Sequence, residues 1–150
     1  TRADINRGTF YAHYTDISMV LDSIMEHVCQ TLREALEKQP LWEKRPDARL
    51  ILQHLQHMIE ADLEFYRNAI RSNVSGTVLE KLRNFFIELM MQRESSYAIH
   101  DHAQYVFMVR FTSGGVIAMY RDWFSGVLPF SLDALTEKAA QSINMALAAL

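Results

Sequence analysis

The chain has 150 residues, of which 49% are hydrophobic and 22% charged, and this balance excludes a disordered or fibrous protein. The net charge of −3 excludes a generally basic nucleic-acid coat, although a local basic patch can be hidden in the sum. Cys29 is the single cysteine, so we expect no internal disulfide, no cysteine-based zinc site and a reducing, cytoplasmic environment. The most apolar stretch, residues 105–130, is interrupted by Arg110, Arg121 and Asp122, so we expect no membrane span.

The sequence predicts an all-α protein, because only three Pro and five Gly punctuate it and β-branched alternation is nearly absent. A short first helix is predicted over residues 7–14, with Asn6 as its N-cap. Asp16 is predicted to cap a second helix that runs to about residue 38. Its apolar residues recur at spacings of three and four, which indicates one buried stripe. The stripe consists of Val20, Leu21, Ile24, Val28, Leu32, Ala35 and Leu36.

Four further helices are predicted along the chain. Asp47 is the expected cap of a helix that continues to Ile70, and Ser75 or Thr77 begins the next, which ends near residue 94. A long helix covers residues 101–125 and a terminal one residues 132–150. Gly114 and Gly115 are costly inside the long helix unless close packing requires them.

Residues 6–14, NRGTFYAHY, concentrate polar and aromatic side chains near the beginning of the chain. On a helix, Arg7, Tyr11 and Tyr14 share one side. Arginine can bind guanine through two hydrogen bonds, and Thr and Tyr hydroxyls can bind phosphates. Gly8 allows a partner to approach the backbone closely. The alternative is a capped surface helix whose aromatic residues only pack.

The stretch ADINRGTFYAHYTD, residues 3–16, resembles the end of the helix-turn-helix in the TetR (TetR/AcrR) family of bacterial transcriptional regulators. Its matching residues are Ala3, Ile5, Asn6, Gly8, Thr9, Phe10, Tyr11, His13 and Tyr14. The resemblance implies that residues 6–14 form a recognition helix for double-stranded operator DNA. The implied DNA-binding residues are Asn6, Arg7, Gly8, Thr9, Tyr11, His13 and Tyr14, of which Tyr14 can instead pack with Phe10.

Two residues depart from the pattern of this family. Asp4 stands where the family usually has Gly, and Ile17 stands where it usually has Lys, so a phosphate contact is expected to be lost. The two helices that precede the motif in the family are absent, and we expect further sequence before Thr1.

The resemblance also implies the domain organisation and the mode of regulation. Residues 1–15 would be the end of a DNA-binding domain, and residues 16–150 a helical domain for ligand binding and dimerisation. The implied function is that of a repressor whose operator affinity is controlled by a small-molecule effector, which requires the effector to bind two arrangements with different affinity. The alternatives are a helical protein-interaction or dimerisation module without DNA binding and, more remotely, a helical enzyme.

Met and aromatic side chains at helical spacing are candidates for an adaptable ligand pocket, although such residues more often form plain core. The candidates are Met58, Tyr66, Phe86, Met90, Tyr105, Met108 and Phe111. Residues 111–124, with the pattern F-x-x-G-G-V-I-x-x-Y-x-x-W-F, resemble the dimerisation region of one regulator subgroup. The expected homodimer residues are Phe111, Gly114, Gly115, Ala118, Trp123, Ile143 and Leu147, with an intrachain contact as the alternative.

Metal binding and catalysis receive little support from the sequence. His54 and His57 stand three residues apart, and His100 and His102 flank Asp101. Because three positions from separate segments would have to converge, surface or capping roles are expected instead. No Ser/His/Asp or Cys/His signature is present, so we expect no enzyme, no cofactor and no metal site.

Overall fold

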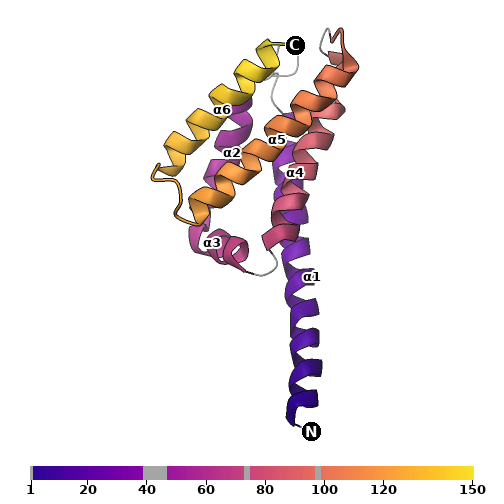
Figure 1. Ribbon diagram of the computed structural model, residues 1–150, viewed down its shortest axis with the longest axis vertical. Helices are drawn as coiled ribbons and strands as arrows, with labels where there is room; N and C mark the ends of the chain where they lie inside the picture. The colour runs from indigo at the N-terminus through magenta and orange to yellow at the C-terminus, as the bar shows by residue number, and fades with distance from the viewer. Residues whose placement is uncertain (1, 39–46, 73–74, 97–98) are drawn as a thin grey trace.

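The computed structural model of the protein describes residues 2–38, 47–72, 75–96 and 99–150. For residues 2–15, 75, 77 and 96 it describes the backbone and not the side chains. The described ranges form six α-helices without a strand, so the predicted all-α fold is confirmed. These helices are α1 (Arg2–Glu37), α2 (Ala48–Ala61), α3 (Leu63–Arg71), α4 (Ser75–Met91), α5 (His102–Phe124) and α6 (Leu132–Ala148), with a 3₁₀ turn, η2 (Glu94–Ser96), before α5. Figure 1 shows the N-terminal half of α1 projecting from a bundle formed by the other helices.

Helix α1 is continuous, so the predicted division into two helices was wrong. Asn6 and Asp16, the expected caps, both lie inside it. The segment contains no Pro, and Gly8 is its one glycine. Asn and Asp inside a helix lower its stability by only a few tenths of a kcal/mol or somewhat more, so two cap-type residues are not sufficient to end it.

The predicted helix from Asp47 to Ile70 is instead two helices that meet at Asp62. Asp47 is the N-cap as expected, and its carboxylate accepts a hydrogen bond from the backbone amide of Arg49. Asp62 ends α2 and begins α3, and its side chain accepts from the amide of Phe65 at 3.3 Å. The carboxylate therefore replaces a helical carbonyl as acceptor, which allows the chain to turn there.

The core lies where the C-terminal half of α1 packs with the other helices. Leu32 and Leu36 of α1 and Leu52 of α2 are among its most buried residues. Packing joins α2 to α6, α4 to α5 and α5 to α6, while α1 contacts α2 and α4. Val20, which was expected in the apolar stripe of α1, is 57% exposed. Within the described residues, no helix is both long and apolar enough to cross a membrane.

The turn between α5 and α6 depends on Gly126. Its φ of +77° lies in the left-handed region that glycine adopts without a steric penalty. Its backbone amide donates to the carbonyl of Trp123 at 3.0 Å, which satisfies one of the last carbonyls of α5. Helix α6 then begins at its N-cap Ser131 and returns along α5 and α2.

Candidate functional site

A small cavity lies inside the bundle between α2, α4, α5 and α6. Its volume is about 50 Å³, and none of its lining residues is charged. The wall consists of Ala48, Ile51, Leu52, Phe86, Met90, Val109, Thr112, Ser113, Val116, Ile143 and Leu147. An apolar space that several helices share is a common form of small-molecule site in helical proteins.

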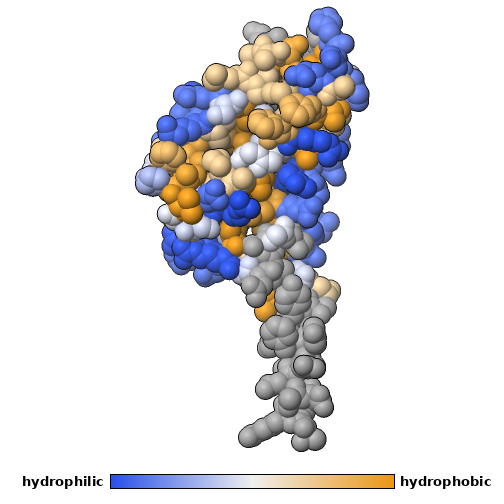
Figure 2. Space-filling view, viewed as in Figure 1, coloured by the Kyte–Doolittle hydropathy of each residue, from blue (hydrophilic) through white to orange (hydrophobic). Residues whose placement is uncertain are grey.

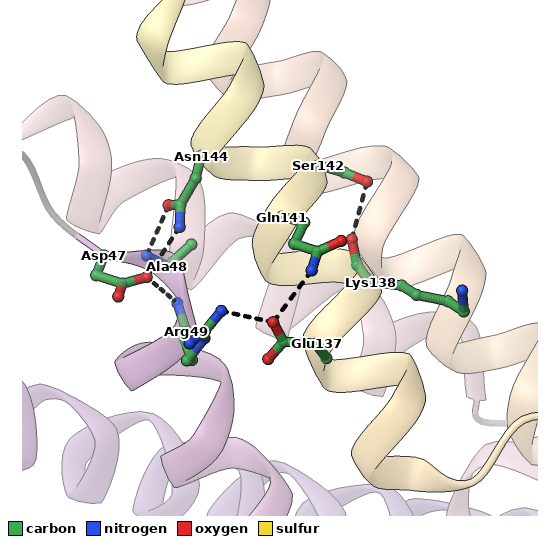
Figure 3. Close-up of polar contacts among 8 residues, drawn as sticks. All are labelled: Asp47, Ala48, Arg49, Glu137, Lys138, Gln141, Ser142 and Asn144. Atoms are coloured by element: carbon green, nitrogen blue, oxygen red, sulfur yellow. Dashed lines mark hydrogen bonds and ion pairs between the residues drawn. The ribbon is translucent and has the colours of Figure 1, made fainter.

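Polar contacts connect the start of α2, which forms part of the cavity wall, with α6 (Figure 3). The backbone amide of Ala48 donates to Oδ1 of Asn144 at 3.0 Å, and Nδ2 of Asn144 donates to the Asp47 carboxylate at 2.9 Å. Nearby, the Arg49 guanidinium pairs with Glu137 of α6 at 2.5 Å. The hydrogen bonds from the Asn144 side chain and then from the Arg49 backbone amide lower the pKa of Asp47. The first turn of α2 is therefore held by residues of the terminal helix.

Two of the seven predicted ligand residues, Phe86 and Met90, line the cavity. Met58 and Tyr66 are half-buried against the core but do not belong to the cavity wall. Burial, and then the charge of Asp62, raises the pKa of Tyr66.

The other predicted ligand residues have different surroundings. Tyr105 is fully buried, and its hydroxyl donates to the Met90 carbonyl at 2.7 Å, near the end of α4. Met108 is half-buried, and its carbonyl accepts from the hydroxyl of Thr112. Phe111 is 67% exposed. Tyr105 is thus adjacent to a cavity residue, while Phe111 faces away from the cavity.

Most of the cavity wall was not anticipated from the sequence. The residues missed are Ala48, Ile51, Leu52, Val109, Thr112, Ser113, Val116, Ile143 and Leu147, of which the last two were expected at the dimer interface. Periodicity indicates which faces of a helix are apolar, but it does not reveal where facing helices leave space. The one signal in the sequence is the low side-chain volume of Ala48, Ser113 and Val116.

A second, larger depression lies on the outside of α5 and α6, and its volume is about 410 Å³. Figure 2 shows apolar surface over these helices, bordered by hydrophilic surface. The groove residues are Phe111, Thr112, Gly115, Val116, Met119, Leu128, Phe130, Leu135, Lys138, Ala139, Ser142, Ile143 and Ala146. Phe111 stacks on exposed Phe107, with ring centroids 5.8 Å apart and an interplanar angle of 13°. An exposed aromatic pair beside an apolar groove indicates an interaction surface.

The predicted dimer residues divide between this groove and the interior. Phe111 and Gly115 line the groove, and Leu147 lines the inner cavity. Ile143 lines both. Trp123 is half-buried against the core, and its indole Nε1 donates to the Phe130 carbonyl at 2.8 Å.

Gly114 and Ala118 are also half-buried on α5. A Cβ atom added at Gly114 or at Gly115 would meet no atom within 4 Å. Close packing within the described chain therefore does not account for these two glycines.

The predicted DNA-reading residues lie in the projecting part of α1. The backbone of this segment is helical, while the side chains of Asn6, Arg7, Gly8, Thr9, Tyr11, His13 and Tyr14 lie outside the described residues. The set therefore stays a prediction.

Farther along, α1 is attached to α4 in two ways. Asp22 pairs with Lys81 at 2.8 Å, and the Arg33 guanidinium lies 5.5 Å from the centroid of the Phe85 ring. Helix α4 also supplies Phe86 to the cavity, so one helix connects the cavity wall with α1.

The histidines make local contacts in the described part of the chain. Nδ1 of His54 lies 2.8 Å from the carbonyl of Leu50, one turn earlier in α2. Nδ1 of His102 lies 2.5 Å from the Glu94 carboxylate. Among the described residues, no group of three or more His, Cys, Asp or Glu residues could hold a metal ion.

Comparison with known families identifies the class of the protein. A TetR family model described as "Transcriptional regulator C-terminal region" matches residues 47–145, roughly two thirds of the chain. The chain therefore belongs to the TetR family of transcriptional regulators, and this membership points to regulation rather than catalysis. No curated protein and no solved structure gives a significant match.

Proposed function

We propose that this TetR-family chain is part of a cytoplasmic DNA-binding repressor in which residues 1–15 complete the DNA-reading head. The supporting observation is the continuity of α1, which runs without a break from the helix-turn-helix-like segment to Glu37 and packs against α2 and α4 of the matched regulatory region. Residues 16–150 then form the ligand-binding and dimerisation domain, with the boundary inside α1. A rigid helix transmits a tilt at its base to its far end, so a small change in the bundle moves Arg7.

Control by a small-molecule effector follows from where α1 is attached. Its partners α2 and α4 also form two walls of the inner cavity. An effector that fits the cavity better in one arrangement of these helices shifts the population of α1 positions. A coupling of about 1 to 3 kcal/mol changes operator affinity by roughly 5- to 150-fold.

The α5–α6 groove is proposed as the homodimer interface. A second copy can place its own exposed Phe111 against the groove, because a two-fold interface uses the same patch on both subunits. The open space next to Gly114 and Gly115 permits close approach of a partner helix. Two paired subunits present two reading heads, as a near-palindromic operator requires.

Promoter binding by the complete protein tests the function directly. We expect the affinity of the dimer for fragments of its own promoter region to fall steeply with salt, because phosphate contacts release counterions. Fluorescence anisotropy over a series of salt concentrations measures this slope. A dimer that shows no salt-dependent binding would instead support a helical interaction module without DNA binding.

A further inference from the structure

Ser113 of α5 places a hydroxyl group on the wall of the inner cavity. Ser113 is a buried residue, with a relative exposure of 8%. No hydrogen bond to this hydroxyl occurs within the described residues. Buried polar groups in native proteins are nearly always paired with protein, water or ligand. An occupant of the cavity is therefore the natural partner for this group.

Thr112, the neighbouring residue on the same wall, differs in this respect. Its hydroxyl donates to the Met108 carbonyl at 2.7 Å and lies 3.2 Å from the Val109 carbonyl. These bonds within α5 already satisfy the hydroxyl as a donor. Of the two polar residues on the wall, Ser113 is thus the one whose hydroxyl lacks a partner in the described protein.

The rest of the wall is uncharged and almost entirely apolar. An ionised ligand placed there would lose its hydration without gaining a charged partner, which is strongly unfavourable. We propose that the cavity binds a small, uncharged and mainly apolar molecule, no larger than a single ring, whose one hydroxyl or carbonyl oxygen hydrogen-bonds to Ser113. This inference rests on the proposed function only in taking the cavity as the effector site.

The size of the cavity sets a further condition on binding. Its volume of about 50 Å³ is well below the roughly 150 Å³ of an engineered apolar cavity that holds benzene. A single-ring ligand must therefore widen the space. Met90 is the most adaptable wall residue because its side chain is long and unbranched, and Leu147 is only half-buried near the end of α6. Widening at these residues displaces α4 or α6, and α4 is the helix attached to α1.

Phenol and toluene are suitable probes because they have the same number of heavy atoms and differ in a hydroxyl or methyl group. Benzoate serves as the charged counterpart. Isothermal titration calorimetry of the complete protein gives the ratio of the dissociation constants of phenol and toluene. We expect Ser113→Ala to weaken phenol binding relative to toluene binding, so that the ratio changes by roughly tenfold, the usual effect of one lost hydrogen bond. Thr31→Val is the control, because the Thr31 hydroxyl donates to the His27 carbonyl on α1, outside the cavity wall. This control leaves the ratio unchanged, and benzoate does not bind.

A measurement on the unsubstituted protein covers the case in which a variant fails to fold. Phenol is expected to move the amide NMR signal of Ser113, and benzoate is expected to leave it in place. The inference is overturned by an unchanged ratio in Ser113→Ala, by an equal shift in Thr31→Val, by benzoate binding as tight as that of phenol, or by no binding of either neutral probe.

Operator binding measured with and without phenol separates this inference from the proposed function. If phenol binds through Ser113 but operator affinity stays constant, the assignment of the ligand class stands and effector control fails. If the protein does not bind DNA at all, the proposed function fails, while the calorimetric result still decides the chemistry of the cavity.

Discussion

The side-chain amide of Asn144, near the end of the chain, donates a hydrogen bond of 2.9 Å to the carboxylate of Asp47, the residue that caps α2. The oxygen of the same amide accepts from the first backbone amide of α2, that of Ala48, at 3.0 Å. A helix start normally depends on its own cap residue or on water. Here a residue 96 positions later in the chain satisfies one of these donors, so α2 and α6 are stabilised together.

Replacement of Asn144 with alanine should lower the free energy of unfolding by about 1 to 2 kcal/mol, since it removes the partners of both Asp47 and Ala48. Urea denaturation followed by circular dichroism measures the loss. Gln141→Ala on the same helix is the control. Its exposed side chain bonds to Glu137 one turn away, and its loss should cost no more than about 0.5 kcal/mol. Equal effects would contradict the role assigned to Asn144.

The pH dependence of stability should include a contribution from Asp47. Its folded pKa is lowered, first by the Asn144 hydrogen bond and then by that of the Arg49 amide. The contribution is therefore fully present above the unfolded pKa of about 3.9 and disappears as the pH falls through the lower folded pKa. Asp47→Asn should make the acid loss of stability shallower below about pH 5.

Urea denaturation between neutral and acid pH provides this comparison. Asp16→Asn is the matched control because Asp16 is an exposed carboxylate on α1. A pH profile of Asp47→Asn that coincides with that of the unsubstituted protein would show that the cap does not contribute to the acid transition.

Phe111→Arg should weaken the proposed homodimer. The substitution places a charge in the apolar groove and removes an aromatic anchor, and the loss of such an anchor costs about 2 kcal/mol or more, equivalent to roughly thirtyfold in the dissociation constant. Sedimentation equilibrium measures the change. Met19→Arg, at an exposed apolar position on α1, should leave dimerisation intact. If Phe111→Arg remains dimeric at the same concentration, the interface lies elsewhere.

Tyr105→Phe should destabilise the bundle by about 1 to 2 kcal/mol, because the partly buried carbonyl of Met90 loses a hydrogen-bond donor. Thermal and urea denaturation measure the loss, with the half-buried Tyr66 replaced with Phe as the comparison. Toluene binding should be unaffected in both variants. A change in toluene affinity without a change in stability would assign Tyr105 to the ligand instead.

Arg7→Ala in the complete protein should weaken operator binding by about 1 to 3 kcal/mol and relax the preference at one base pair, if Arg7 reads a guanine. Arg67→Ala is the control because Arg67 lies on α3 and pairs with Glu64. Quantitative footprinting on the operator compares the two variants. An identical footprint for Arg7→Ala and the unsubstituted protein would remove Arg7 from the DNA contacts.

The sequence by itself determined the fold class and much of the core. The three- and four-residue spacing of apolar side chains predicted helices over most of the chain, and residues such as Leu32 and Leu36 are buried as expected. Asp47 was correctly predicted as a cap. These features are local, because helical periodicity and capping depend on residues within a turn or two of one another.

Only the tertiary structure decided the continuity of α1, the break at Asp62 and the position of the cavity. Asp16 and Asp62 are the same residue type, yet the first lies within a helix and the second separates two helices. Phe86 and Ser113 face the same space from different helices, and no sequence spacing relates them. Whether facing side chains leave a void depends on the distance between helix axes and the fit of all the surrounding side chains.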